Sequence, residues 1–197
     1  MSDGAIRVGL LLSVSTLGFK AGCRVMLPDL PAFGSFVRAA AQAPTSAIYG
    51  LIYDVAVQDD PFSRRFVIAE PPEEVIRDQQ KNRQVPIEVG VLAVGYAENG
   101  RIVHRLPPQP PVTMEYLYPC TPDEVVAFTR RFDYFRLVLN APGLPADELL
   151  AASLWTAAAA RPVAERRPFL VEAGRELARL LAADPLRLDG LLKRIRP

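Results

Sequence analysis

Apolar and polar residues alternate along much of the first half of the chain, and this two-residue period predicts β-strands. The expected strands cover Ile6–Ser15, Phe19–Leu27, Ser35–Arg38, Ala47–Val57, Val85–Tyr96 and Arg101–Arg105. The last two are joined through Asn99-Gly100, a residue pair that favours the tight turn of a β-hairpin. Short strands separated by turn residues and proline clusters favour an antiparallel arrangement over a parallel sheet with crossover helices.

Glycines inside these strand patterns predict the bends that a small barrel needs in order to close. Gly9 and Gly50 stand within apolar strand segments, where a glycine usually marks a bulge or a sharp bend. Gly34 precedes the third strand and marks the turn that leads into it. We therefore expect a small closed, or nearly closed, antiparallel β-barrel of at least five strands over residues 6–105.

Two helices with clear start signals are expected within or just after the barrel. Pro71–Gln84 begins with prolines and acidic residues, which suit the first turn of a solvated helix. Thr121 fits the N-cap of a second helix that runs to about Phe132, with Glu124 completing a capping box. Tyr134–Leu139 fits either a returning strand or a continued helix. No other helix is expected before residue 143.

The composition changes after Pro142–Pro145, where Ala and Leu begin to dominate and Arg and Glu fill the remaining positions. Helices are expected over Ala146–Ala160, Pro162–Ala183 and Pro185–Ile195, with a break at Pro168 left open. The predicted fold class is mainly β with α. Residues 1–142 are expected to form the barrel with its inserted helices, and residues 143–197 a C-terminal helical region.

The tail carries apolar positions at helical spacing, and such stripes must be buried against something. One candidate cover is the open side of the barrel in the same chain, and the other is a partner or a neighbouring subunit. We favour the second, because a barrel fills its own interior and leaves little else to cover. A basic end follows the stripes and adds to this predicted interaction surface. The expected interaction residues are Leu177, Leu181, Leu188, Leu191, Lys193, Arg194 and Arg196.

The composition of the chain argues against several classes of protein. The 197 residues are half hydrophobic and carry a net charge of +1, which excludes the disorder signature and gives no support to a strongly basic nucleic-acid binder. The longest apolar stretches are shorter than the roughly 20 residues of a membrane span. No secretory signal pattern is found, and Cys23 and Cys120 show no metal-binding spacing. We expect a cytoplasmic protein that does not enter a membrane.

The motifs of common enzymes are not found in the sequence. There is no phosphate-binding P-loop, no dinucleotide-binding glycine pattern and no nucleophile elbow. His104 is the single histidine and is expected to be a surface or rim side chain, while Asp59-Asp60-Pro61 is expected to form a turn. The prediction is therefore no catalytic, cofactor-binding or metal-ligating residue, no metal and no ATP hydrolysis.

Three segments resemble the HAS barrel, a domain shared by HerA-type DNA-translocating ATPases and rotary ATP synthases. In that family a first strand carries a glycine followed by apolar residues, as in Val8–Ser13. A Gly-x-Phe/Tyr-Val step then enters the third strand, as in Gly34–Val37, and a glycine-containing strand follows, as in Ile48–Ile52. The resemblance covers about residues 6–140.

The resemblance implies an assembly role. In HerA-type proteins this barrel precedes an ATPase domain, forms the crown of a hexameric ring and contacts a nuclease of the NurA type. No ATPase motif is found in this chain, so the implied role is a non-enzymatic assembly or adaptor module in DNA processing and repair. Its expected partners are a HerA-type ATPase, a NurA-type nuclease or other copies of itself.

A nucleic-acid-binding role is the alternative. An OB-like barrel would act directly on DNA through exposed aromatic and arginine side chains. The candidate region is rich in aromatic residues, most of which are expected to be in the core: Tyr116, Tyr118, Phe128, Phe132, Tyr134 and Phe135. The sequence leaves direct contact with nucleic acid open.

Overall fold

A computed structural model describes residues 7–25, 31–42, 47–58, 61–69, 71–82 and 85–196. The described strands are β1 (Gly9–Val14), β2 (Gly18–Val25), β3 (Phe36–Ala40), β4 (Ala47–Val57), β5 (Val85–Glu98), β6 (Arg101–Val103) and β7 (Tyr116–Pro119). The described helices are α1 (Pro61–Ile68), α2 (Glu73–Asn82), α3 (Pro122–Phe128), α4 (Phe135–Leu139), α5 (Ala146–Ala159), α6 (Val163–Leu180) and α7 (Pro185–Ile195).

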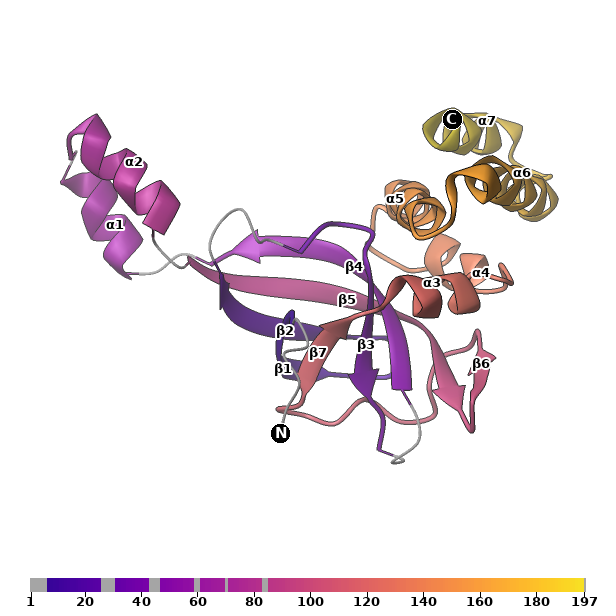
Figure 1. The fold of residues 1–197 in the computed structure, drawn as a ribbon, viewed down its shortest axis with the longest axis horizontal. Coiled ribbons are helices and arrows are strands. Elements are labelled where there is room, and N and C mark those ends of the chain that lie inside the picture. The colour runs from indigo at the N-terminus through magenta and orange to yellow at the C-terminus, as the bar shows by residue number, and fades with distance from the viewer. Residues whose placement is uncertain are drawn as a thin grey trace.

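Six of the described strands close into an antiparallel β-barrel. They follow the order β2-β1-β7-β3-β4-β5, and β5 pairs again with β2 to complete the ring. β6 lies outside the ring, as a short hairpin strand on β5. Figure 1 shows the barrel at the centre of the molecule, with α1 and α2 projecting from one end and α3–α7 gathered on the other side. The predicted closed antiparallel barrel followed by helices is confirmed.

Alternation along β5 shows how the sequence builds the barrel wall. Ile87, Val89 and Val91 are buried in the cluster that fills the interior. Val94 points to the opposite face of the strand and belongs to the second cluster, which the helices share. The pairing of β4 with β5 shifts register between Tyr49 and Gly50, so the bend expected at Gly50 is present.

A second hydrophobic cluster joins the outer wall of the barrel to the helices. Phe36, Tyr49 and Leu51 contribute to it from β3 and β4, and they are buried together with residues of α3–α7. Leu51 and Ile52 are adjacent on β4 and both are fully buried. Leu51 lies in the cluster shared with the helices, and Ile52 lies in the cluster inside the barrel. A strand that is apolar on both sides must be covered on both faces, and here the tail helices supply the outer cover.

α5 is the centre of the tail. It contacts α3, α4, α6, α7 and β4. Polar links fasten α7 to it: Arg187 pairs with Asp147 at 2.7 Å, and Arg194 pairs with Glu148 at 2.7 Å. The indole Nε1 of Trp155 also donates to the carbonyl of Arg194 at 2.9 Å.

Several predicted elements need correction. β7 was not expected, and it completes the barrel beyond residue 105. α1 lies before residue 143 and was not expected, and α3 ends at Phe128 rather than near Phe132. Of the two alternatives for Tyr134–Leu139, the helix is present, as α4. α6 runs through Pro168 without a break. Within the described residues, no helix combines the length and apolarity needed to cross a membrane. The expected Asp59-Asp60 turn lies outside the described residues.

Candidate interaction surfaces

The pair of helices α1 and α2, which we call the arm, exposes several apolar side chains. The arm is inserted between β4 and β5 and stands away from the barrel (Figure 1). Val67 and Ile68 on α1 are 72% and 81% exposed, and Val75 on α2 is 42% exposed. None of the arm side chains that the structure describes is buried. The arm therefore presents apolar side chains that its own chain does not cover.

The apolar side chains of the arm lie beside acidic ones. Glu73 and Glu74 occupy the first turn of α2, directly before Val75. Glu73 forms an ion pair with Arg77 one turn later. Glu74 is exposed and has no ion pair among the described residues. Arg65 in the last turn of α1 is likewise exposed and without an ion pair among the described residues, so the arm carries unpaired charges of both signs.

A groove of about 520 Å³ lies between α6 and α7, and we call it the tail groove. Its apolar residues are Leu170, Val171, Gly174, Ala178, Leu192 and Ile195. Its charged residues are Arg175, Lys193, Arg196 and the single carboxylate Asp189, which pairs with Lys193 at 2.6 Å. Arg175 and Arg196 have no ion pair among the described residues. The tail groove is therefore apolar with a positively charged rim.

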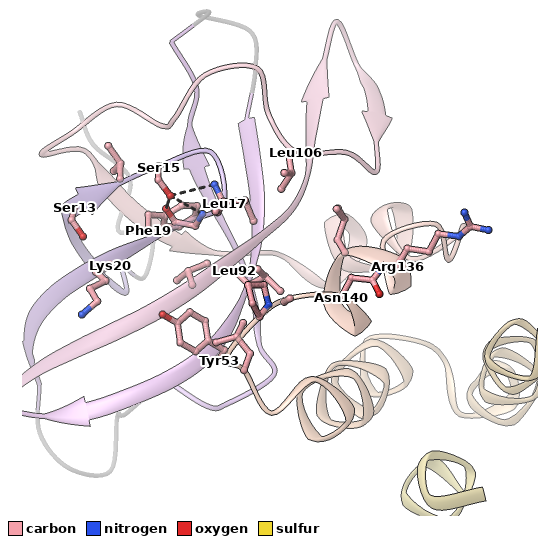
Figure 2. A pocket seen from close by; sticks show the side chains of 18 residues that line it. Ser13, Ser15, Leu17, Phe19, Lys20, Tyr53, Leu92, Leu106, Arg136 and Asn140 are labelled. Carbon is pink, nitrogen blue, oxygen red and sulfur yellow. Dashed lines mark hydrogen bonds between the residues drawn. The ribbon is translucent and has the colours of Figure 1, made fainter. Parts of the chain in front are cut away.

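A larger hollow of about 670 Å³ lies between the barrel and the segment that links α4 to α5, and we call it the barrel groove. In Figure 2 Leu17, Phe19 and Leu92 line the barrel side, and Arg136 and Asn140 reach it from α4.

The lining of the barrel groove holds no carboxylate, imidazole or thiol. Its Lys20 is held at 2.6 Å by Glu88, whose hydrogen bond raises the pKa of that lysine. Ser15 is occupied in the β1–β2 turn, where its hydroxyl donates to the carbonyl of Gly18 at 2.9 Å. The barrel groove is therefore suited to holding an apolar group rather than to moving a proton.

His104 lies in the core and not on the surface or rim, where it was expected. Its side chain is only 5% exposed. The ring packs on Phe128 with centroids 4.5 Å apart, and Nε2 lies 3.0 Å from the Phe128 carbonyl oxygen. Burial lowers the pKa of His104, because the charged imidazolium loses hydration there. His104, which directly follows β6, therefore packs this part of the chain against the end of α3.

A buried arginine joins α3 to the tail. Arg161 is 8% exposed, and its guanidinium donates to the Thr129 hydroxyl at 2.8 Å and to the Ala157 carbonyl at 2.6 Å. The same group lies 3.7 Å from the ring centroid of Phe169. Burial lowers the pKa of Arg161. The guanidinium thus serves as a cross-link between elements.

Cysteine chemistry is not favoured by the surroundings of the thiols. Cys23 and Cys120 are free, and burial raises the pKa of each thiol. Both are therefore poor sources of the reactive thiolate at neutral pH. Within the described ranges, no group of three or more histidine, cysteine, aspartate or glutamate side chains is placed to hold a metal ion.

The predicted turn residues of the barrel lie at turns or close approaches. Asn99 and Gly100 have positive φ angles of 49° and 76° and join β5 to β6 as a hairpin. Gly34 has a φ of +81°, and a Cβ added there would lie 2.5 Å from the Cβ of Ala152 on α5. Gly50 lies at the register shift in β4. Gly9 begins β1, where an added Cβ would lie 2.7 Å from the carbonyl oxygen of Gly22.

The expected interaction residues of the tail need a larger correction. Leu177, Leu181 and Leu191 are buried in the cluster of their own chain, and Leu188 is half-buried against it. These leucines cannot offer a surface to another molecule, because they are already buried in the cluster where α6 and α7 pack on α5 and on each other.

The basic residues of the tail divide between two roles. Arg194 forms an ion pair with Glu148 on α5. The prediction that Arg194 is available to a partner is therefore also wrong. Lys193 and Arg196 do line the tail groove. The arm residues Val67, Ile68 and Val75 were missed by sequence reasoning. The signal that was available is the run Phe66-Val67-Ile68 inside an otherwise charged segment.

The aromatic region is mostly core, as expected. Phe128, Tyr134 and Phe135 are buried, and Phe132 packs against the same cluster. Tyr116 and Tyr118 on β7 remain half-buried. The guanidinium of Arg7 lies 4.1 Å from the Tyr116 ring centroid, and that of Arg38 lies 5.4 Å from the Tyr118 ring centroid. This pair of stacked arginines is the surface that a nucleic-acid-binding barrel would use.

No protein-family model matches the chain, and no curated protein matches its sequence.

Proposed function

We propose that this chain is a non-enzymatic assembly or adaptor module that works in the cytoplasm. Its barrel resembles the HAS barrel, and we place it beside a HerA-type ATPase and a NurA-type nuclease in DNA processing and repair. In this role the chain binds proteins and organises them, while the chemistry belongs to its partners.

The arm is the observation that supports this proposal most directly. Its Val67 and Ile68 side chains are more than two-thirds exposed. Apolar side chains that project from a molecule and are not covered by it mark surfaces that bind other proteins. The tail groove and the barrel groove add two further apolar hollows. A module with several such surfaces on one small barrel is suited to holding partners together.

The alternative is an OB-like barrel that binds nucleic acid directly. It is favoured by Tyr116 and Tyr118, which lie on one strand beside Arg7 and Arg38. Against it, the Arg38 guanidinium is paired with Glu124 at 2.9 Å, which reduces the positive charge offered to a phosphate.

Binding measurements with the candidate partners test the proposal. The full chain is immobilised, and a HerA-type ATPase, a NurA-type nuclease and single-stranded DNA are each titrated at physiological salt. We expect saturable binding of the ATPase or the nuclease, weakened at least tenfold by Ile68→Asp on the arm. Met114→Asp is the matched control, because Met114 is 85% exposed but lies far along the chain from the arm.

A different binding result would contradict the adaptor role. Binding of DNA alone, falling steeply as salt rises and lost in a Tyr118→Ala variant, would replace the adaptor role with the nucleic-acid role.

A further inference from the structure

We infer that the tail groove binds an acidic amphipathic helix of a partner protein. The apolar face of that helix lies on the floor of the groove, and its carboxylates lie at the rim. The inference rests on the proposed adaptor role and gives the chemistry of one surface that a partner must present. Two features of the tail groove support it, namely its hollow apolar floor and its unpaired basic rim.

The floor of the tail groove is hollow because small residues of α6 face α7. Gly174 has no side chain, and a Cβ added there would lie 3.3 Å from Cδ2 of Leu192. Ala178, one turn later, adds only a methyl group. Val171 and Leu192 flank this strip and are 47% and 36% exposed. The groove of about 520 Å³ lies within the range of ligand-binding clefts, about 300–1,000 Å³, and its apolar side chains remain open to contact.

Unpaired cations surround this floor. Arg175 and Arg196 line the groove, are exposed and have no ion pair in the described part of the chain. Arg167 lies four residues before Val171 on α6, so it extends the same face of the helix by one turn. Arg167 is also exposed and has no ion pair among the described residues. An occupant with carboxylates along its flanks would complement these arginines.

The carboxylates near the groove do not cancel this positive charge. Asp189 is the only carboxylate among the lining residues that the structure describes, and Lys193 pairs with it at 2.6 Å. None of the three glutamates of α6 lines the groove: Glu165, Glu172 and Glu176. The rim therefore attracts negative charge.

Shape and charge together favour a helix over other negatively charged partners. A nucleic-acid backbone supplies phosphates but no apolar side chains for the floor between Val171 and Leu192. An anionic membrane presents a broad surface and not a projecting cylinder, so it does not fill a hollow between two helices. An amphipathic helix presents one apolar face with charged flanks, which match the floor and the rim at once.

Binding of synthetic peptide helices to the full chain tests the inference. The probe is a helix of about 15 residues with leucines on one face and glutamates on both flanks. We expect saturable binding in isothermal titration calorimetry, at least tenfold tighter than for two control peptides. One control has lysines in place of the glutamates, and the other has alanines in place of the leucines. Equal affinity for the glutamate and lysine peptides would overturn the inference.

A substitution on the floor locates the binding site. Val171→Asp places a charge among the apolar side chains and should abolish binding of the glutamate helix. Leu186→Asp is the matched control and should leave binding unchanged, because Leu186 is 86% exposed on α7 but does not line the groove. Circular dichroism verifies that each variant is folded. Undiminished binding by folded Val171→Asp would place the peptide elsewhere and overturn the inference.

Charge reversal at the rim supplies an independent measurement. The double variant Arg175→Glu/Arg196→Glu should bind the lysine helix more tightly than the glutamate helix. Arg130→Glu is the matched charge control, because Arg130 is exposed, lies outside the groove and has no ion pair among the described residues. A double variant that still prefers the glutamate helix would contradict the role of the rim.

Three further samples identify any other occupant. Phosphatidylglycerol vesicles and single-stranded DNA are titrated into the wild type and Val171→Asp, and self-association of both chains is measured by sedimentation velocity. Suppose that the glutamate helix does not bind and that Val171→Asp abolishes binding of vesicles, binding of DNA or self-association. The groove then belongs to a membrane, a nucleic acid or a second copy, and the inference is overturned.

Failure of the inference is distinguishable from failure of the proposed function. A chain that binds the HerA-type ATPase but not the glutamate helix retains its adaptor role and loses only the proposed groove ligand. A chain that binds the glutamate helix in the groove but binds neither ATPase nor nuclease supports the inference and refutes the placement beside those partners.

Discussion

The tail and the arm are both helical additions to one barrel, yet they differ in how the chain treats their apolar side chains. In the tail, Leu154 and Leu177 are completely buried, and ion pairs from Asp147 and Glu148 fasten α7 to α5. In the arm, Ile68 is 81% exposed. The tail therefore belongs to the folded core, while the arm is an appendage whose Val67 and Ile68 side chains remain exposed. Helical composition alone does not distinguish these two roles.

The largest effect should come from shortening a tail leucine. Leu177→Ala removes a fully buried side chain from the cluster that joins the tail to the barrel. We expect the free energy of unfolding to fall by about 2–5 kcal/mol, the range for buried leucines. Urea denaturation measures it. A loss below about 1 kcal/mol would mean that the tail is not part of the cooperative core.

The next effect should come from the buried arginine. Arg161→Met keeps the aliphatic bulk but removes the hydrogen bonds to Thr129 and Ala157. We expect a loss of about 1–3 kcal/mol, since the Ala157 carbonyl is left without its guanidinium donor. Arg175→Met, at an exposed arginine without an ion pair, is the matched control and should change stability by no more than about 0.5 kcal/mol.

His104 should make stability depend on pH. Its pKa is lowered from 6.5 by burial, so the folded state binds its proton less readily than the unfolded chain. The stabilising contribution is present above pH 6.5 and is lost as the pH falls through the lower folded value. Denaturation of the wild type and of His104→Gln between pH 7 and pH 5 should show a steeper fall for the wild type. Parallel curves would contradict this assignment.

The smallest effect should come from the arm. Ile68→Ala shortens an exposed side chain, so the free energy of unfolding should change by no more than about 0.5 kcal/mol. The same denaturation experiment measures it beside Leu177→Ala. A loss comparable to that of Leu177→Ala would show that the arm packs on its own chain, and the contrast between the two regions would disappear.

Local signals in the sequence were read with good accuracy. β4 and α7 have the bounds expected from their apolar runs, Ala47–Val57 and Pro185–Ile195. The Asn99-Gly100 turn and the Thr121–Glu124 capping box are both present. In each case, neighbouring residues along the chain determine the geometry by themselves, through a hydrogen bond or a preferred backbone angle.

Elements that depend on distant partners were missed. β7 has only four residues, and Tyr116–Pro119 becomes a strand because β1 and β3 bond to it from either side. His104 was expected at the surface, and it is buried because Phe128 and Tyr134 pack around it. Neither packing partner is adjacent in sequence, so no local pattern could reveal these outcomes.

The sequence by itself determined that this chain is a barrel with helices, that the fourth strand bends at Gly50, and that leucines such as Leu177 and Leu191 must be buried. Only the tertiary structure decided what covers these leucines. The spacing of the leucines predicts that Leu177 and Leu191 are buried. It does not identify the covering surface, because the hydrophobic effect is non-directional and any apolar surface would serve. α5 supplies that surface to α6 and α7, and the outer wall of the barrel at β4 in turn covers α5, whereas no described side chain of the arm is buried.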